Sequence, residues 1–294
     1  QPSSVPTSMP TTIYAGYSAY PAFESDTKRI LTSDFVDFHF GWVADTTEEI
    51  ATINDDLETS IRMQFGMPIA KMEGVQEPLA EIAYQAYVNM HTQSVINGEL
   101  QAGESPSALS AMWKYQSTER GRIAVNHAMD VMAGAAIQEG PNNILANTYK
   151  SMPIAITVEG ANILSRSLVT FGGGLMRSHP HLRNLVDAIQ DENTGSFLKH
   201  LSLMIGHTVS NFCKALVRNR YALFAFTSNM VLTLGAKYKR SEYISSRMAD
   251  IFSIRVMCAG IEALTQDDMR DYALKRLHNE ELQAYKDVEN ELPL

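Results

Sequence analysis

Apolar residues recur at steps of three and four along most of the chain from residue 46 onward, as they do on one face of a helix. The first such set is Ile50, Ile53, Leu57 and Ile61. Thr46 and Glu49 precede it with the spacing of a capping box, which marks a helix start. We expect this helix to end before Pro68, and a second to begin after Gly74 and to stop at Asn97-Gly98.

The same period continues toward the C-terminus. Ser105-Pro106 is a start signal for a third helix, and a fourth is expected after Gly160. A short and a long helix follow His179-Pro180, and two or three more fill the C-terminal third. The best strand-type run, residues 154–158, is short. The expected fold class is therefore all-α, a bundle whose helices bury their apolar stripes against each other.

Residues 1–45 differ from the rest and lead us to divide the chain into three parts. This segment holds Pro2, Pro6, Pro10 and Pro21, together with Tyr14, Tyr17, Tyr20, Phe23, Phe35, Phe38, Phe40 and Trp42. The prolines prevent a continuous helix, so we expect an extended arm. Docking of the arm on another surface and covering of this chain's own helices are both open interpretations. We predict the arm at 1–45, a helical bundle at 46–180 and a C-terminal helical extension at 181–294.

Two C-terminal segments are distinguished by their charge. The uncharged stretch from Tyr221 to Ala236 is interrupted by polar residues and is shorter than the roughly 18 to 20 apolar residues that span a bilayer. We therefore expect a buried core helix and no membrane span. The stretch from Asp267 to Asn290 is highly charged with sparse apolar residues, which favours a surface helix or a docking tail.

Composition narrows the classes of function. The chain has 294 residues, of which 45% are hydrophobic, so it can bury a core. Its 24 Lys and Arg against 33 Asp and Glu give a formal net charge of −9, and nucleic acid is therefore not expected as a main partner. Cys213 and Cys258 lie far apart, which predicts neither a disulfide scaffold nor a structural zinc site and fits a reducing compartment. Because the chain begins with Gln1, we expect a processed product or a partial chain.

The histidines do not suggest a metal centre. His200 and His207 share a helix face but are two turns, about 10 Å, apart, which is too far for one metal ion. His179 and His181 flank Pro180 in a turn, where a surface or capping role is expected. The sequence therefore predicts no metal ligands.

Four ordered blocks of sequence resemble one enzyme family. The most distinctive, residues 153–166, reads Pro-Ile-Ala-Ile-Thr-Val-Glu-Gly-Ala-Asn-Ile-Leu-Ser-Arg. The others are Arg62-Met-Gln-Phe-Gly-Met-Pro-Ile-Ala with Glu73-Gly-Val-Gln-Glu, then Thr118-Glu-Arg-Gly with Ala128-Met-Asp, then Gly140-Pro-Asn-Asn. Together, over roughly residues 60 to 255, they resemble the C-terminal part of acyl-CoA dehydrogenases, particularly the bacterial long-chain branch.

The resemblance implies an architecture and a cofactor. Acyl-CoA dehydrogenases have an N-terminal helical domain, a middle β domain and a C-terminal four-helix domain, with FAD held between the last two and across a subunit interface. This chain resembles the third domain, and residues upstream of 60 do not resemble the other two. In the family the middle domain binds the flavin ring and much of the acyl-CoA.

The resemblance also implies residue roles. Glu159 matches the catalytic base, which takes the α-proton of an acyl thioester while the β-hydride goes to flavin N5. A glutamate stabilised at a helix N-terminus is the alternative. Arg62, Gln64 and Phe65 match the arginine and aromatic that reach the FAD of the neighbouring subunit. For Arg62 the alternative is a surface arginine that caps a helix end.

The sequence departs from the family pattern near the cofactor. Residues 131–136 stand where the family usually has Gly-Gly-x-Gly, and Gly134 alone matches. Added methyl groups are expected to push a backbone contact with the cofactor outward, and to strain any position with positive φ. Asn147 stands where the long-chain branch tends to have arginine, and the branch's C-terminal extension is cut short.

These observations favour a pseudoenzyme. We expect an accessory or structural subunit of a larger assembly, without autonomous dehydrogenase activity and without a cofactor of its own. The expected host is mitochondrial, in the matrix or on the matrix side of the inner membrane. A respiratory-chain complex is the first candidate for the host, and a homologous acyl-CoA dehydrogenase is a candidate partner. The competing interpretation is a split enzyme that a partner chain completes. The two chains would share FAD, and the enzyme would oxidise fatty acyl-CoA to the 2-enoyl-CoA. A third interpretation is a fragment of a longer enzyme.

Overall fold

The computed structural model describes residues 59, 61–103, 107–140, 143, 145–158, 160–167, 179–234, 241–263 and 268–291. Ten α-helices lie in these residues, together with one short 3-10 helix and one β-hairpin. The all-α prediction is therefore confirmed for this part of the chain. The predicted arm at 1–45, the capping box at Thr46 and the first helix up to Leu57 lie outside the described residues.

A β-hairpin leads into Pro68, where the sequence predicts the end of a helix. Strand β1 (Met63–Gln64) pairs antiparallel with β2 (Met67–Pro68). Phe65 and Gly66 form the turn, with φ angles of 52° and 81°. Positive φ at both central residues matches the twist of the two strands, and it is uncommon for a residue as bulky as phenylalanine.

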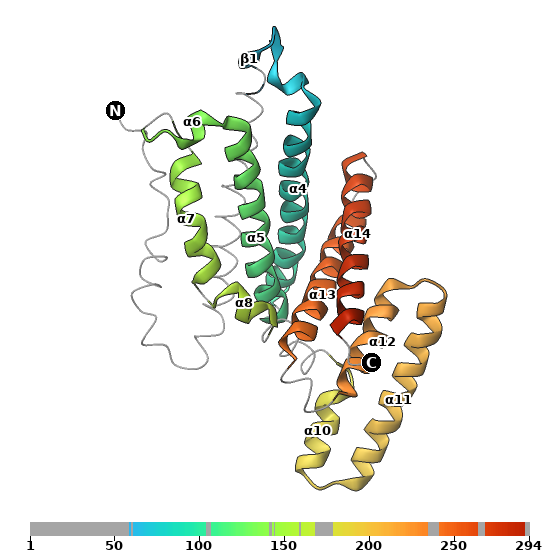
Figure 1. Ribbon diagram of the computed structural model, residues 1–294. Coiled ribbons are helices and arrows are strands. Elements are labelled where there is room, and N and C mark those ends of the chain that lie inside the picture. Colours follow the sequence, from blue (N-terminus) through green and yellow to red (C-terminus); the bar gives the residue numbers. More distant parts are fainter. Residues whose placement is uncertain are drawn as a thin grey trace, which may run out of the picture.

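Four long helices form the centre of the molecule. They are α4 (Glu73–Gln101), α5 (Ser107–Met132), α13 (Glu242–Glu262) and α14 (Asp268–Glu291). Helices α4 and α5 run side by side, and α13 and α14 form a second pair that packs on α4 (Figure 1). Helix α4 passes through the predicted stop at Gly98 and ends before Gly103, whose φ of 83° suits a left-handed C-terminal cap.

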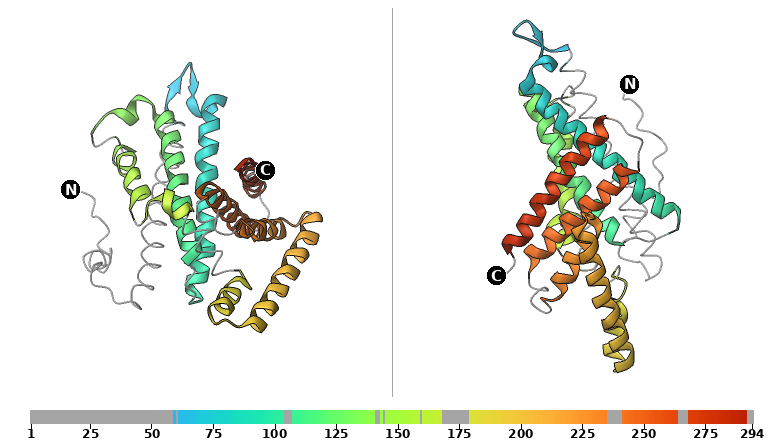
Figure 2. Two further views of the ribbon diagram at one scale, coloured as in Figure 1. Left: turned by 60° about the horizontal axis from the view of Figure 1, so that its bottom comes forward. Right: turned by 90° about the vertical axis from the view of Figure 1, so that its right-hand side faces the viewer.

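Shorter elements surround this centre. They are η3 (Ile69–Lys71), α6 (Gly134–Ile137), α7 (Leu145–Thr157), α8 (Asn162–Leu164), α10 (Leu182–Gln190), α11 (Thr194–Leu216) and α12 (Arg220–Leu232). Helix α7 packs on α5, while α10, α11 and α12 form the end of the molecule opposite the hairpin (Figures 1 and 2). The short strand-type run at residues 154–158 is largely helical. Residues 154–157 belong to α7, which buries Met152 and Ala155 at a helical spacing and leaves Ile154 exposed.

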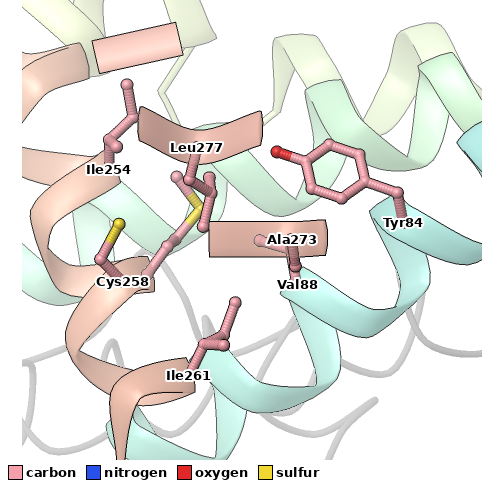
Figure 3. Close-up of a cluster of buried hydrophobic side chains, with 8 residues drawn as sticks. Tyr84, Val88, Ile254, Cys258, Ile261, Ala273 and Leu277 are labelled. Atoms are coloured by element: carbon pink, nitrogen blue, oxygen red, sulfur yellow. The ribbon is translucent and has the colours of Figure 1, made fainter. Parts of the chain in front are cut away.

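The core joins α4, α13 and α14. Figure 3 shows the cluster, formed by Tyr84, Val88, Ile254, Met257, Cys258, Ile261, Ala273 and Leu277. Burial of each large aliphatic side chain contributes about 1.5–3 kcal/mol, so this cluster accounts for much of the stability of the centre. Further clusters extend the core to α5 and α7 on one side and to α12 on the other.

The uncharged stretch at 221–236 and the charged stretch at 267–290 both contain a helix in the structure, but only the second is packed as the sequence predicts for its type. Helix α12 buries Ala222 and Val231 but exposes Leu223 and Met230, so it is half-buried and not the core helix that its low charge predicts. The charged C-terminal segment forms α14, whose apolar face packs on α13 and α4. Among the described residues, no helix combines the length and the apolar character needed to cross a bilayer.

Candidate functional site

The candidates for cofactor contact lie where the hairpin meets the end of α5. Arg62 precedes β1, Gln64 and Phe65 lie at the hairpin turn, and Gly134 begins α6. The Nη1 atom of Arg62 donates to the carbonyl oxygen of Met132 at 3.4 Å, which joins residues 70 positions apart. Gln64 and Phe65 are on the surface, and Phe65 is 93% exposed. The structure thus brings Arg62 to the α5–α6 turn and leaves the other two at the tip.

The α5–α6 turn is shaped by Ala133. Its φ of 51° and ψ of −122° lie in a region that alanine rarely adopts and that glycine adopts without strain. A Cβ at the neighbouring Gly134 would have no heavy atom within 4 Å, so internal packing does not require glycine there. The backbone at Ala133 therefore has a conformation that favours glycine, within the segment 131–136 that departs from the predicted glycine pattern.

A buried lysine holds the backbone on both sides of Glu159. Lys114, on α5, is 2% exposed, and its Nζ donates to Ile156 O at 3.1 Å, Gly160 O at 2.7 Å and Asn162 Oδ1 at 2.7 Å. These three acceptors satisfy the ammonium group, which is the condition for burying it. Glu159 itself lies outside the described residues.

The Asn162 side chain extends this network. Its Nδ2 donates to Thr118 Oγ1 at 2.9 Å and to Glu119 Oε1 at 3.0 Å, both on α5. Gly160, with a φ of 89°, adopts a conformation that favours glycine. Sequence reasoning missed Lys114, although a lysine beside Met112 and Trp113 on an apolar helix face was a signal that it needed buried partners.

A second charged cluster joins α4, α5 and α14. Buried Arg120 donates to Gln85 Oε1 at 2.8 Å and to Glu280 Oε2 at 2.8 Å, while Tyr84 Oη donates to Glu280 Oε1 at 2.6 Å. Burial alone raises the pKa of Glu280, but Arg120 and these hydrogen bonds outweigh it and lower the pKa below its usual value. Glu280 is therefore ionised and paired, which suits a structural cross-link better than proton transfer.

The structure brings together the two pairs of histidines that the sequence treats separately, and His179 accepts hydrogen bonds from the backbone at the start of α10, as its predicted capping role requires. The ring of His181 lies 6.4 Å from that of His200 and 6.1 Å from that of His207, so residues that the sequence treats separately form one cluster with His179. No three His, Cys, Asp or Glu side chains among the described residues are arranged to hold a metal ion.

Comparisons with known proteins agree with this architecture. Residues 59–171 match the family described as acyl-CoA dehydrogenase, C-terminal domain. A solved structure of an acyl-CoA dehydrogenase from Bacillus anthracis, complexed with FAD, is similar to the chain with a TM-score of 0.62 and 15% sequence identity. That similarity covers 89% of this chain and 48% of the other, so the chain spans about half the length of the solved protein.

The two comparisons differ in what they identify. The family match ends at residue 171, short of the range of about 60 to 255 over which the sequence resembles the family. The structural similarity extends over more of the chain, but at this identity it shows the fold alone. Residues 59–171 therefore form an acyl-CoA dehydrogenase-like C-terminal helical domain.

Proposed function

We propose that this chain is a structural subunit of a larger protein assembly, built on an acyl-CoA dehydrogenase-like helical domain, and that it does not oxidise acyl-CoA by itself. The observation that carries the proposal is the geometry of the residues that the resemblance assigns to cofactor contact. The guanidinium group of Arg62, which would pair with a phosphate, contacts the chain's own Met132 carbonyl, and Ala133 has a positive φ that favours glycine. In the proposed subunit these residues hold no FAD of their own.

The surface supports a role in an assembly. Helix α11 buries no residue, and exposed apolar side chains recur along it at helical spacing. They are Leu198, Ile205, Val209, Phe212 and Leu216, each at least 45% exposed. Contiguous exposed apolar surface of this kind is typical of proteins that associate. The resemblance alone suggests a mitochondrial host, and fractionation of the native source tests that part of the proposal.

Flavin content of the native assembly tests the proposal. We expect an assembly purified through a tag on this chain to contain other protein subunits, and to show no flavin absorbance in proportion to this chain. Arg62→Ala should leave the subunit composition and any flavin content unchanged, because Arg62 is engaged within the chain. Flavin in a one-to-one ratio that is lost in Arg62→Ala would refute a purely structural role.

A split dehydrogenase is the second candidate, and the Lys114 network favours it. Its contacts to Ile156 and Gly160 hold the backbone on either side of Glu159, as a positioned base requires. FAD shared with a partner chain would supply the hydride acceptor. In this candidate Glu159 accepts the α-proton and Lys114 keeps its loop in place.

Glu159→Gln distinguishes the two functions. In a split enzyme, adding acyl-CoA to the native assembly bleaches flavin absorbance, and Glu159→Gln abolishes the bleaching. Glu139→Gln is the matched control, because Glu139 is an exposed carboxylate that pairs with Lys150. Bleaching that survives in the control and disappears in Glu159→Gln, with the assembly intact, establishes the enzyme. If wild type shows no bleaching, the split-enzyme candidate is wrong.

A further inference from the structure

Four histidines meet between the turn before α10 and helices α11 and α12. The ring centroid of His179 lies 5.2 Å from that of His207 and 6.2 Å from that of His181. His181 lies within 6.4 Å of both His200 and His207. His179 is 8% exposed, so the cluster includes a buried imidazole.

Hydrogen bonds fix the protonation of His179. Its Nδ1 accepts from the backbone N–H groups of His181 at 3.2 Å and Leu182 at 3.0 Å, where α10 begins. An atom that accepts two N–H groups carries no proton itself, so the proton is on Nε2. Nε2 then donates to Asn229 Oδ1, 2.8 Å away on α12. The neutral ring thus fastens the start of α10 to α12.

Asn229 also contacts two residues of α11. Its Nδ2 donates to Thr208 Oγ1 at 2.9 Å and lies 3.2 Å from His207 Nδ1. On the other side of this ring, Asn211 Nδ2 lies 2.9 Å from His207 Nε2 and is oriented by its bond to the His207 carbonyl. Amide donors thus face both ring nitrogens. A neutral ring can accept from one of them, whereas an imidazolium can accept from neither.

The surrounding charges also favour neutral rings. Burial lowers the pKa of His179; the hydrogen bond to Asn229 opposes this shift, His181 adds to it, and the pKa stays below its ordinary value. Burial lowers the pKa of His207 as well, with additional contributions from His179, His181 and Lys214. From α12 the facing group is the uncharged Asn229. Residues 193–241 contain no Asp or Glu, so α11 and α12 supply no carboxylate that could stabilise an imidazolium.

We propose that this histidine cluster is a pH-sensitive latch, which holds α10 on α11 and α12 when its rings are neutral and releases α10 when they are protonated. A proton on His179 Nδ1 would face the two backbone N–H groups that begin α10, and a doubly protonated His207 would face two amide donors. Because the folded cluster binds protons less readily than the unfolded chain does, its stabilisation is complete above about pH 6.5 and is lost as pH falls below that value.

Hydrogen–deuterium exchange of the full chain tests the latch. Labelling at pH 7.5 and pH 5.5, with times matched to the intrinsic exchange rate at each pH, should show at least a tenfold loss of protection in peptides from α10 at the lower pH. Peptides from α4 should keep their protection. His278, on α14, also has a pKa lowered by burial, so a response in α14 peptides is scored separately.

A change of charge at Asn229 separates the latch from general acid instability. Asn229→Asp places a carboxylate beside His179 and His207 that favours their protonated forms, so α10 should lose its protection at a higher pH than in wild type, already at pH 6.5. Asn126→Asp, the same change at an exposed position of α5, should behave like wild type. If Asn229→Asp is already unprotected at pH 7.5, His207→Gln replaces it and should reduce the pH response. Equal protection of wild-type α10 at both pH values overturns the latch. So does a response that Asn229→Asp does not move to a higher pH and that His207→Gln does not reduce.

Discussion

Gly260 is where α13 approaches α4 most closely, so an added methyl group there tests the packing of the centre. A Cβ on Gly260 would lie 2.9 Å from Val95 Cγ2 and 3.3 Å from the His91 carbonyl oxygen. The first distance is shorter than carbon atoms tolerate, and the second neighbour is backbone, which cannot rotate away. Gly260→Ala therefore forces α13 away from α4 or moves Val95 from its place.

The size of the effect follows from two opposing contributions. Overpacking of a dense core costs about 1–3 kcal/mol, while alanine in a helix interior is favoured over glycine by about 0.5–1 kcal/mol. We expect Gly260→Ala to lower the free energy of unfolding by about 0.5–2 kcal/mol. Gly206, in α11, has no heavy atom within 4 Å of the position that a Cβ would occupy, so Gly206→Ala should raise stability by about 0.5–1 kcal/mol.

Urea unfolding followed by far-UV circular dichroism measures both variants. With a slope of about 3 kcal/mol per molar urea, the two midpoints should differ by about 0.3–1 M and lie on opposite sides of wild type. Val95→Ala makes room for the methyl group, so it should cost less in the Gly260→Ala background than in wild type. Stabilisation by Gly260→Ala, or equal shifts in both alanine variants, would refute the close approach of the two helices.

Other predictions concern buried charge, thiol reactivity and backbone strain. Glu281 accepts from the Nη2 of Arg255 at 2.8 Å with both side chains buried, so Glu281→Gln should cost about 3–5 kcal/mol in urea unfolding, whereas an Arg255→Met/Glu281→Leu pair should cost much less. Burial raises the pKa of the Cys258 thiol to about 12, so an aromatic disulfide reagent should label the exposed Cys213 alone in the native chain and both thiols after denaturation. Ala133→Gly should raise the thermal midpoint, because it removes strain of about 1 kcal/mol or more at a positive φ; an unchanged or lower midpoint contradicts that strain.

The long helices could be predicted from the sequence because their apolar spacing agrees with how they pack. The hairpin at 63–68 could not be predicted, because its turn places Phe65 at a positive φ that phenylalanine rarely adopts. The low charge of residues 221–236 suggested a buried helix. In the structure, α12 instead buries the polar Ser228 and Asn229 on one side, because Asn229 has partners on α11 and before α10.

Site residues were predictable one at a time but their contacts were not. The spacing of His200 and His207 was read from one helix, whereas the ring between them, His181, comes from another segment. Likewise, the Arg62 contact with Met132 spans 70 positions and depends on the hairpin that leads into α4. Periodicity describes single elements, and contacts of this kind depend on how the elements are placed.

The core is physically separate from the residues that the sequence predicts to contact a cofactor. The buried clusters lie along α4, α5, α13 and α14, whereas Phe65 is almost fully exposed and a side chain at Gly134 would meet nothing. A substitution at the hairpin tip or the α5–α6 turn thus affects local strain, of order 1–3 kcal/mol, and leaves the core unchanged. The residues predicted to contact flavin can therefore change without loss of the fold. Similarity over residues 59–171 therefore identifies the architecture, and the activity depends on side chains that the core does not need.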